Sequence, residues 1–123
     1  MMKLLSTVLI SLVAIEHLYI LYMEMFAWET LGKKTFRQFP ADLFAPTKGL
    51  AANQGLYNGF LAAGLIWSLL ISDPEWSKNV GLFFLSCVSI AGCYGAISAA
   101  KRIFYVQALP AIIALSVLLF AHA

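Results

Sequence analysis

Charged side chains are scarce in this sequence, and the scarcity limits what kind of protein it can be. Only 11% of the 123 residues are Asp, Glu, Lys or Arg, whereas 62% are hydrophobic. Soluble domains have roughly 45–50% apolar and about 25% charged residues. A net charge of +2, without interleaved basic and aromatic residues, is too small for a nucleic-acid-binding surface. The mean hydropathy of +0.85 predicts that the natural solvent of this chain is a lipid bilayer.

Cysteine and histidine are also few, which argues against disulfides, metals and cofactors. Cys87 and Cys93 fall in one predicted helix, about 9 Å apart along its axis and about 240° apart around it. We therefore expect them to pack as small residues rather than to pair. No CxxC or HxxxH spacing predicts a metal site, and His122 is predicted to lie too far from His17 for a haem site. Without a nucleotide-binding loop or nucleophile elbow, no cofactor is predicted either.

Long apolar segments are what the sequence does contain. Four of them reach the roughly 20 residues needed to cross the hydrocarbon core of a membrane. They cover about residues 4–28, 50–71, 80–100 and 103–121. A polar turn with Pro74 separates the second from the third, and Lys101-Arg102 separates the third from the fourth. We predict an all-α integral membrane protein, a four-helix bundle in which residues 1–123 form one transmembrane domain.

The first connection, from Glu29 to Gly49, is the longest. It alternates apolar with basic side chains and is interrupted by Pro40 and Pro46. The side chains concerned are Phe36, Phe39, Leu43 and Phe44 among Lys33, Lys34, Arg37 and Lys48. This mixture is typical of a segment that lies in the headgroup region with its apolar side toward the lipid. The alternative is a plain cytoplasmic loop with a few buried anchors.

Basic residues are distributed unevenly among the connections, which predicts an orientation. The first and third connections carry six Lys or Arg, whereas the N-terminus and the second connection carry two, Lys3 and Lys78. Basic loops stay in the cytoplasm. We therefore expect a multi-pass protein of the plasma (inner) membrane with both termini outside the cytoplasm.

Three ionisable residues interrupt the first apolar segment: Glu16, His17 and Glu24. At about 100° per residue they fall within roughly a quarter-turn of one helix, and Tyr19 flanks them. Ionisable groups inside a membrane are costly and commonly functional. These three are the candidates for acid/base or proton-carrying groups, because a buried Glu–His pair can hold or move a proton near neutral pH. The alternative is that His17 is only a satisfied hydrogen-bonding residue.

Polar residues of the other segments are predicted to lie in the same, cytoplasmic half of the membrane. We expect an intramembrane pocket there, open toward the cytoplasm; the rival is a tightly packed polar core without a cavity. The candidate ligand-binding residues are Tyr19, Asn53, Gln54, Tyr57, Asn58, Tyr94 and Gln107. The alternative is that the Asn and Gln side chains only hold helices together by hydrogen bonds. Gly55 and Gly59 form a GxxxG pair, which allows another backbone to approach closely.

Several motifs together resemble a family of small four-helix membrane proteins of bacteria and some fungi, known as a domain of unknown function. The motifs are Ile15-Glu16-His17, Glu24-Met25-Phe26, Asn53-Gln54-Gly55-Leu56-Tyr57-Asn58-Gly59, Ala91-Gly92, Tyr94-Gly95, Val106-Gln107 and Pro110. The resemblance covers nearly the whole chain. It implies a multi-pass membrane protein and brings no activity, substrate or assigned site.

Three functions stay open at the level of the sequence. The first is binding of a lipophilic small molecule in the pocket, with conversion of it by acid/base chemistry as a further option. The second is proton-coupled transport, since small multidrug transporters also have four helices and a Glu in the first. The sequence around that Glu, however, differs from theirs. The third is a non-catalytic subunit of a membrane complex. Gly55 and Gly59, or the small residues of the third segment, could also join copies into a homo-oligomer.

Overall fold

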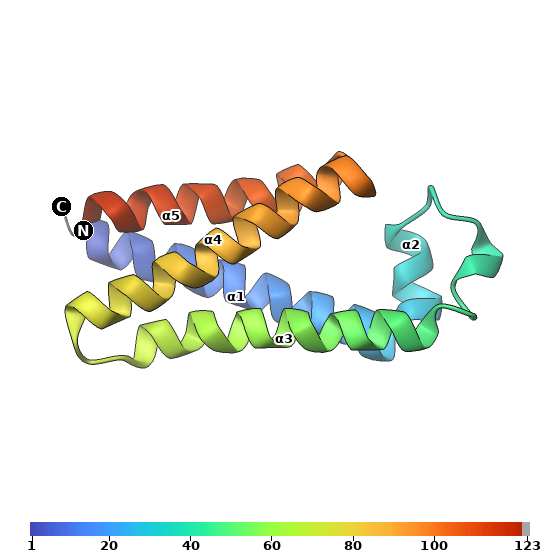
Figure 1. The fold of residues 1–123 in the computed structure, drawn as a ribbon, viewed down its shortest axis with the longest axis horizontal. Coiled ribbons are helices and arrows are strands. Elements are labelled where there is room, and N and C mark those ends of the chain that lie inside the picture. Colours follow the sequence, from blue (N-terminus) through green and yellow to red (C-terminus); the bar gives the residue numbers. More distant parts are fainter. Residues whose placement is uncertain (122–123) are drawn as a thin grey trace. The chain divides into compact units, whose positions relative to one another are not determined.

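The structure, a computed structural model, describes residues 1–121, and every regular element in that range is a helix (Figure 1). The α-helices of residues 1–121 are α1 (Met2–Phe26), α2 (Lys33–Thr35), α3 (Lys48–Leu70), α4 (Pro74–Ser98) and α5 (Leu109–Ala121). Two π-helical turns, η1 (Trp28–Gly32) and η3 (Phe104–Ala108), and one 3-10 turn, η2 (Ala41–Leu43), lie between them. The prediction of an all-α protein is confirmed. His122 lies outside the described residues.

Within residues 1–121, three helical stretches are long and apolar enough to cross a membrane. They are Met2–Phe26, Pro74–Ser98 and Phe104–Ala121. The 23-residue helix α3 is not among them, because the amides of Asn53, Gln54 and Asn58 lower the hydropathy of its first half. The length and composition of the three stretches indicate a membrane protein.

Hydroxyl side chains of the apolar helices bond to carbonyls of their own helix. In α1, the Ser11 hydroxyl donates to the Thr7 carbonyl at 2.8 Å, and in α4 the Ser86 hydroxyl donates to the Leu82 carbonyl at 2.7 Å. The same arrangement recurs at Ser6, Thr7, Ser89, Ser98 and Ser116. A polar group without a partner costs free energy in an apolar solvent. The local bonds therefore make these residues compatible with lipid.

Helix α4 begins at Pro74, six residues before the predicted start at residue 80. Asp73 is its N-cap, and its carboxylate accepts a hydrogen bond of 2.9 Å from the Trp76 backbone N–H. Proline cannot continue a helix but is well suited to its first position, where its missing N–H would have had no partner. The turn thus ends α3 and starts α4. The Ser77 hydroxyl joins them by donating to the Ser68 carbonyl at 2.7 Å.

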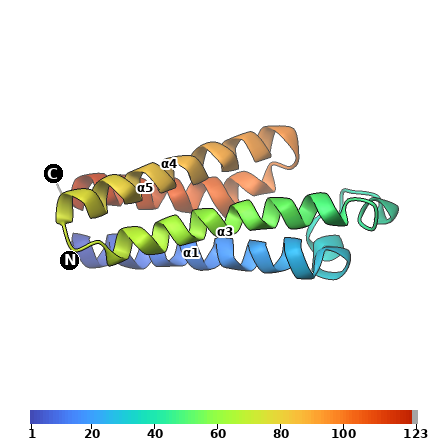
Figure 2. The same cartoon turned by 60° about the horizontal axis from the view of Figure 1, so that its bottom comes forward.

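The described chain forms two compact units. Unit 1 comprises Met1–Ala14 and the residues from Leu61 onward. Its α4 and α5 run side by side (Figures 1 and 2). The core of unit 1 consists of Ile10, Val13, Ala14, Leu65, Leu85, Val88, Ala111, Ala114 and Leu118. Gly92 lets η3 come close, since a Cβ there would lie 2.6 Å from the Ala108 backbone nitrogen.

Unit 2 comprises Ile15–Phe60. In it the last part of α1 and the first part of α3 run side by side, and the long connection caps their ends (Figures 1 and 2). The Trp28 ring lies 4.9 Å from the Phe44 ring and 5.7 Å from the Phe36 ring, between centroids. Phe44 is 1% exposed. The connection is therefore folded around an aromatic cluster of its own.

Candidate functional site

In unit 2, a hydrogen bond joins two predicted site residues, Glu24 on α1 and Asn58 on α3. The Asn58 side-chain amide donates to Glu24 Oε1 at 2.7 Å and to the Gln54 carbonyl at 3.2 Å. Both hydrogens of this amide are thus used, and Asn58 is 8% exposed. Hydrogen bonds between helices in a membrane are worth about 0.6–2 kcal/mol each. The bond fixes one carboxylate oxygen of Glu24 and leaves the other for further contacts.

Two glycines make this contact between α1 and α3 close. A Cβ on Gly55 would lie 2.8 Å from Met25 Cγ and 3.0 Å from Glu24 Cβ. A Cβ on Gly59 would lie 2.5 Å from Leu21 Cδ1. The GxxxG pair therefore faces α1 within the same chain, which brings Asn58 within reach of Glu24. A homo-oligomer through these two glycines stays a prediction.

Glu16 and His17 lie about 12 Å and 10 Å along α1 from Glu24. His17 is 1% exposed. Glu16 is half-buried, and its Oε1 atom is buried without a hydrogen-bond partner among the described residues. An acceptor left in this state is costly in an apolar medium. A hydrogen-bond donor beside this oxygen would remove that cost, and because the oxygen is buried, such a donor reaches it only when neighbouring side chains move.

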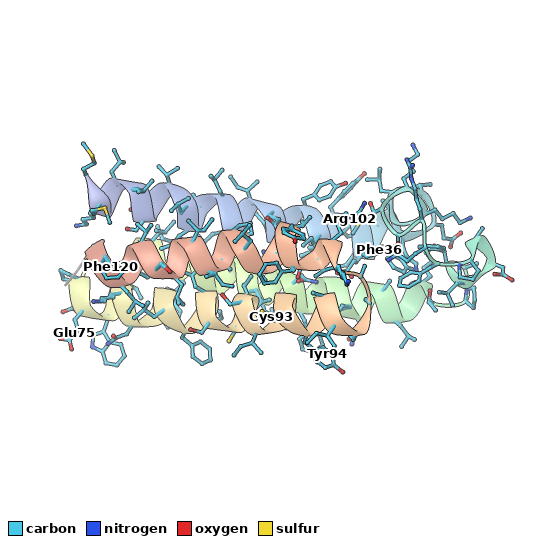
Figure 3. The ribbon with its side chains drawn as sticks, turned by 90° about the horizontal axis from the view of Figure 1, so that it is seen from above. Phe36, Glu75, Cys93, Tyr94, Arg102 and Phe120 are labelled. Atoms are coloured by element: carbon cyan, nitrogen blue, oxygen red, sulfur yellow. The ribbon has the colours of Figure 1, made fainter. Side chains whose placement is uncertain are left out.

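The other predicted site residues are placed differently. In unit 2, Tyr19, Asn53, Gln54 and Tyr57 are exposed. In unit 1, Tyr94 is 71% exposed and projects away from α4 (Figure 3), and Gln107 in η3 is half-buried. Within unit 2 the structure brings Glu24 and Asn58 together. Of the exposed residues, Gln54 contacts this pair only through its backbone carbonyl, and the role of the exposed side chains in binding stays a prediction.

Sequence reasoning missed the way in which Trp28 holds the long connection. The Trp28 indole N–H donates to the Thr47 hydroxyl at 2.9 Å, and that hydroxyl donates to the Leu43 carbonyl at 2.8 Å. Nearby, Lys48 Nζ lies 3.8 Å from Glu29 Oε1 at the surface. The sequence signal for this contact is that Trp28 lies at the start of the long connection and Thr47 near its end.

The chemistry that these groups can perform is limited but specific. Carboxyl groups accept hydrogen bonds and can hold a proton, an amide donates and accepts hydrogen bonds, and a buried histidine, His17, belongs to the same unit. Acid/base chemistry or the binding of a hydrogen-bond donor fits this set. Among the hydrogen bonds described for residues 15–60, the 2.7 Å bond between Glu24 and Asn58 joins α1 to α3 through side chains.

Comparison with known proteins places the chain in a family. A family model described as "Protein of unknown function (DUF1304)" matches residues 11–119. The chain is also 33% identical over 118 residues to "Uncharacterized protein YpaA" of Lactococcus lactis subsp. lactis (strain IL1403), covering 93% of this chain and 96% of the relative. No solved structure matches. The chain belongs to the DUF1304 family, and the resemblance seen in its motifs is confirmed.

Proposed function

We propose that this protein binds a lipophilic small molecule inside the membrane through the acidic groups of unit 2. The observation that carries the proposal is the buried Glu16 Oε1 atom without a hydrogen-bond partner among the described residues. A carboxyl oxygen accepts hydrogen bonds, so the ligand should carry an O–H or N–H donor on an apolar body. Acid/base conversion of that ligand would use the same groups.

The pairing of Glu24 with Asn58 supports this proposal. A carboxyl group held at 2.7 Å by an amide has a defined position, which is what recognition of a ligand requires. Glu16 and Glu24 are about 12 Å apart along one helix. A ligand that contacts both is therefore elongated, and it lies along α1. Transport of protons with the ligand, and a role as a subunit without a ligand, are the alternatives that the experiment below separates.

The proposal includes a membrane arrangement. α3 is the fourth span, which makes a four-helix bundle, because 23 residues cover about 35 Å of helix. The basic connections, which contain Lys34 and Lys101, then face the cytoplasm from the inner membrane, and the first lies at the headgroups. Both termini are outside. Glu24 is then nearer to the cytoplasm than Glu16.

The test is the identification of molecules that purify with the protein. We expect mass spectrometry of an organic extract to find one lipophilic compound enriched with the wild type. Its amount should fall about fivefold in Glu16→Leu, because leucine has no acceptor and a lost hydrogen bond is worth about 1 kcal/mol. Glu24→Gln should lower it as well, and since Gln can still accept the bond from Asn58, the fold should be kept.

The matched control is Glu75→Gln, since Glu75 is exposed in the first turn of α4. This variant should retain the compound at the level of the wild type. Equal amounts in all four proteins, or no enriched compound in the wild type, would show that the acids bind no such ligand. Proton uptake by vesicles when the compound is added, lost in Glu24→Gln, would instead establish transport.

A further inference from the structure

A second feature lies in unit 1, at the end of the α4–η3 hairpin. There the surface is hollowed by a cavity of about 350 Å³ lined by Cys93, Ala96, Ile97, Lys101, Phe104 and Tyr105. We call this the hairpin groove. It belongs to one unit, since all six residues follow Leu61. Figure 3 labels Cys93 on α4 and Arg102 in the turn that follows.

Local sequence explains why the groove is there. Gly92 and Gly95 let η3 approach α4, with a Cβ at Gly95 lying 3.0 Å from Ile103 Cγ2. Beside this contact, Cys93 and Ala96 are too small to fill the space. Phe104 and Tyr105 belong to the π-helical turn η3, where the Leu109 N–H bonds to the Phe104 carbonyl. Pro110 follows at once, and π-helical turns are often found at functional sites.

The walls of the groove are apolar and its end is cationic. Ile97 is 88% exposed and Tyr105 is 66% exposed, so the side walls meet the surrounding solvent. For spans in a bilayer that solvent is lipid. Lys101 is an exposed lining residue in the turn between α4 and η3, and a turn between two spans lies at the level of the headgroups. Along the axis of α4, Cys93 lies about 7 Å from Ser98, the last residue of the helix. The groove therefore extends from the headgroup level into the hydrocarbon region.

We propose that the hairpin groove binds one anionic phospholipid. Its acyl chain lies along Ile97 and Phe104, and its phosphate group contacts the Lys101 ammonium. Charge complementarity selects the occupant: apolar walls alone suit any acyl chain, whereas a lysine at the headgroup level favours a lipid of net negative charge. The groove contains no residue of unit 2, and this proposal does not depend on the function of the acidic groups there.

The test uses the purified full-length protein in detergent with added dioleoyl phosphatidylglycerol or dioleoyl phosphatidylcholine. Native mass spectrometry measures how much of each lipid stays bound. We expect the wild type to prefer phosphatidylglycerol. Lys101→Gln should weaken that binding about fivefold, to the level of phosphatidylcholine, because one basic side chain loses its attraction to the anion. Ala96→Leu should fill the groove and weaken the binding of both lipids.

Two matched variants serve as controls. Lys78→Gln removes a lysine from unit 1 that does not line the groove, and Ala91→Leu enlarges an exposed alanine on the same helix. Both should bind as the wild type does. The proposal is overturned if Lys101→Gln keeps the preference, if Lys78→Gln loses it equally, or if inorganic phosphate displaces the lipid, which would mean a free-phosphate site. Because Lys101 is exposed, its variant tests the proposal even if Ala96→Leu fails to fold.

Discussion

At the scale of single residues, the glycines of this protein differ in what surrounds them. Gly92 faces backbone atoms of Ala108, which cannot move without shifting η3. Gly59 faces Leu21 Cδ1, the far end of a flexible side chain, and Gly49 has nothing within 4 Å. How well an added Cβ is tolerated therefore depends on the atoms that it would contact. Residue type alone does not predict that order, since all three are glycines in or beside long helices.

The corresponding prediction is a ranking of three glycine-to-alanine variants. Gly92→Ala should lower the free energy of unfolding by about 1–3 kcal/mol, because overpacking against backbone forces a shift. Gly59→Ala should cost less, since Leu21 can change rotamer. Gly49→Ala should be neutral or stabilising, as alanine favours a helix by up to about 1 kcal/mol. Thermal unfolding in one detergent measures all three, and a Gly59→Ala variant less stable than Gly92→Ala would contradict the ranking.

At the scale of elements, the helix boundaries depend on caps that a hydropathy pattern does not reveal. Asp73 caps α4 through the Trp76 N–H, so the helix starts within the polar turn instead of at the first apolar residue. Asp42 stands in the first turn of η2, where the structure has no side-chain cap bond. Two aspartates at the starts of helical segments thus differ in whether a carboxylate caps the segment.

We predict that Asp73→Ala lowers the free energy of unfolding by about 1 kcal/mol, because the Trp76 N–H loses its acceptor. Asp42→Ala should change it by less than about 0.5 kcal/mol, as substitutions at such surface positions do. Denaturant titration of both variants in the same detergent measures the difference. Equal losses would mean that Asp73 does not act as a cap.

How far the sequence predicts this protein also depends on the element. Apolar length was enough to predict that α1, α4 and the helix that ends at Ala121 exist, because membrane-spanning stretches are defined by composition, but it missed the first six residues of α4. The π-helical turns η1 and η3 were not predicted, since they arise from local backbone bonding. Glu24 and Asn58 were both candidates, but their contact depends on Gly55 meeting α1 in space. Which of several polar residues meet cannot be deduced from their depth alone.

At the scale of the whole molecule, the membrane arrangement can be tested with cysteines. After Cys87 and Cys93 are replaced by Ala, Lys34→Cys, Glu75→Cys and Lys101→Cys each add one thiol to a connection. If α3 spans the membrane, an impermeant thiol reagent added to intact cells should label only Glu75→Cys. Labelling of Lys34→Cys together with Glu75→Cys would mean that α3 does not cross. Labelling of Lys34→Cys and Lys101→Cys alone would mean that the orientation is the reverse of the predicted one.

The hydroxyls that bond back to their own helix have an evolutionary consequence. Each one shares a carbonyl that the helix backbone already satisfies, so replacing it by a methyl or a thiol leaves no acceptor stranded. Positions such as Ser11 and Ser86 can therefore drift among Ser, Thr, Ala and Cys without loss of folding. Homologues in the DUF1304 family should vary freely there, while Gly92, where even one methyl group meets backbone, should change rarely.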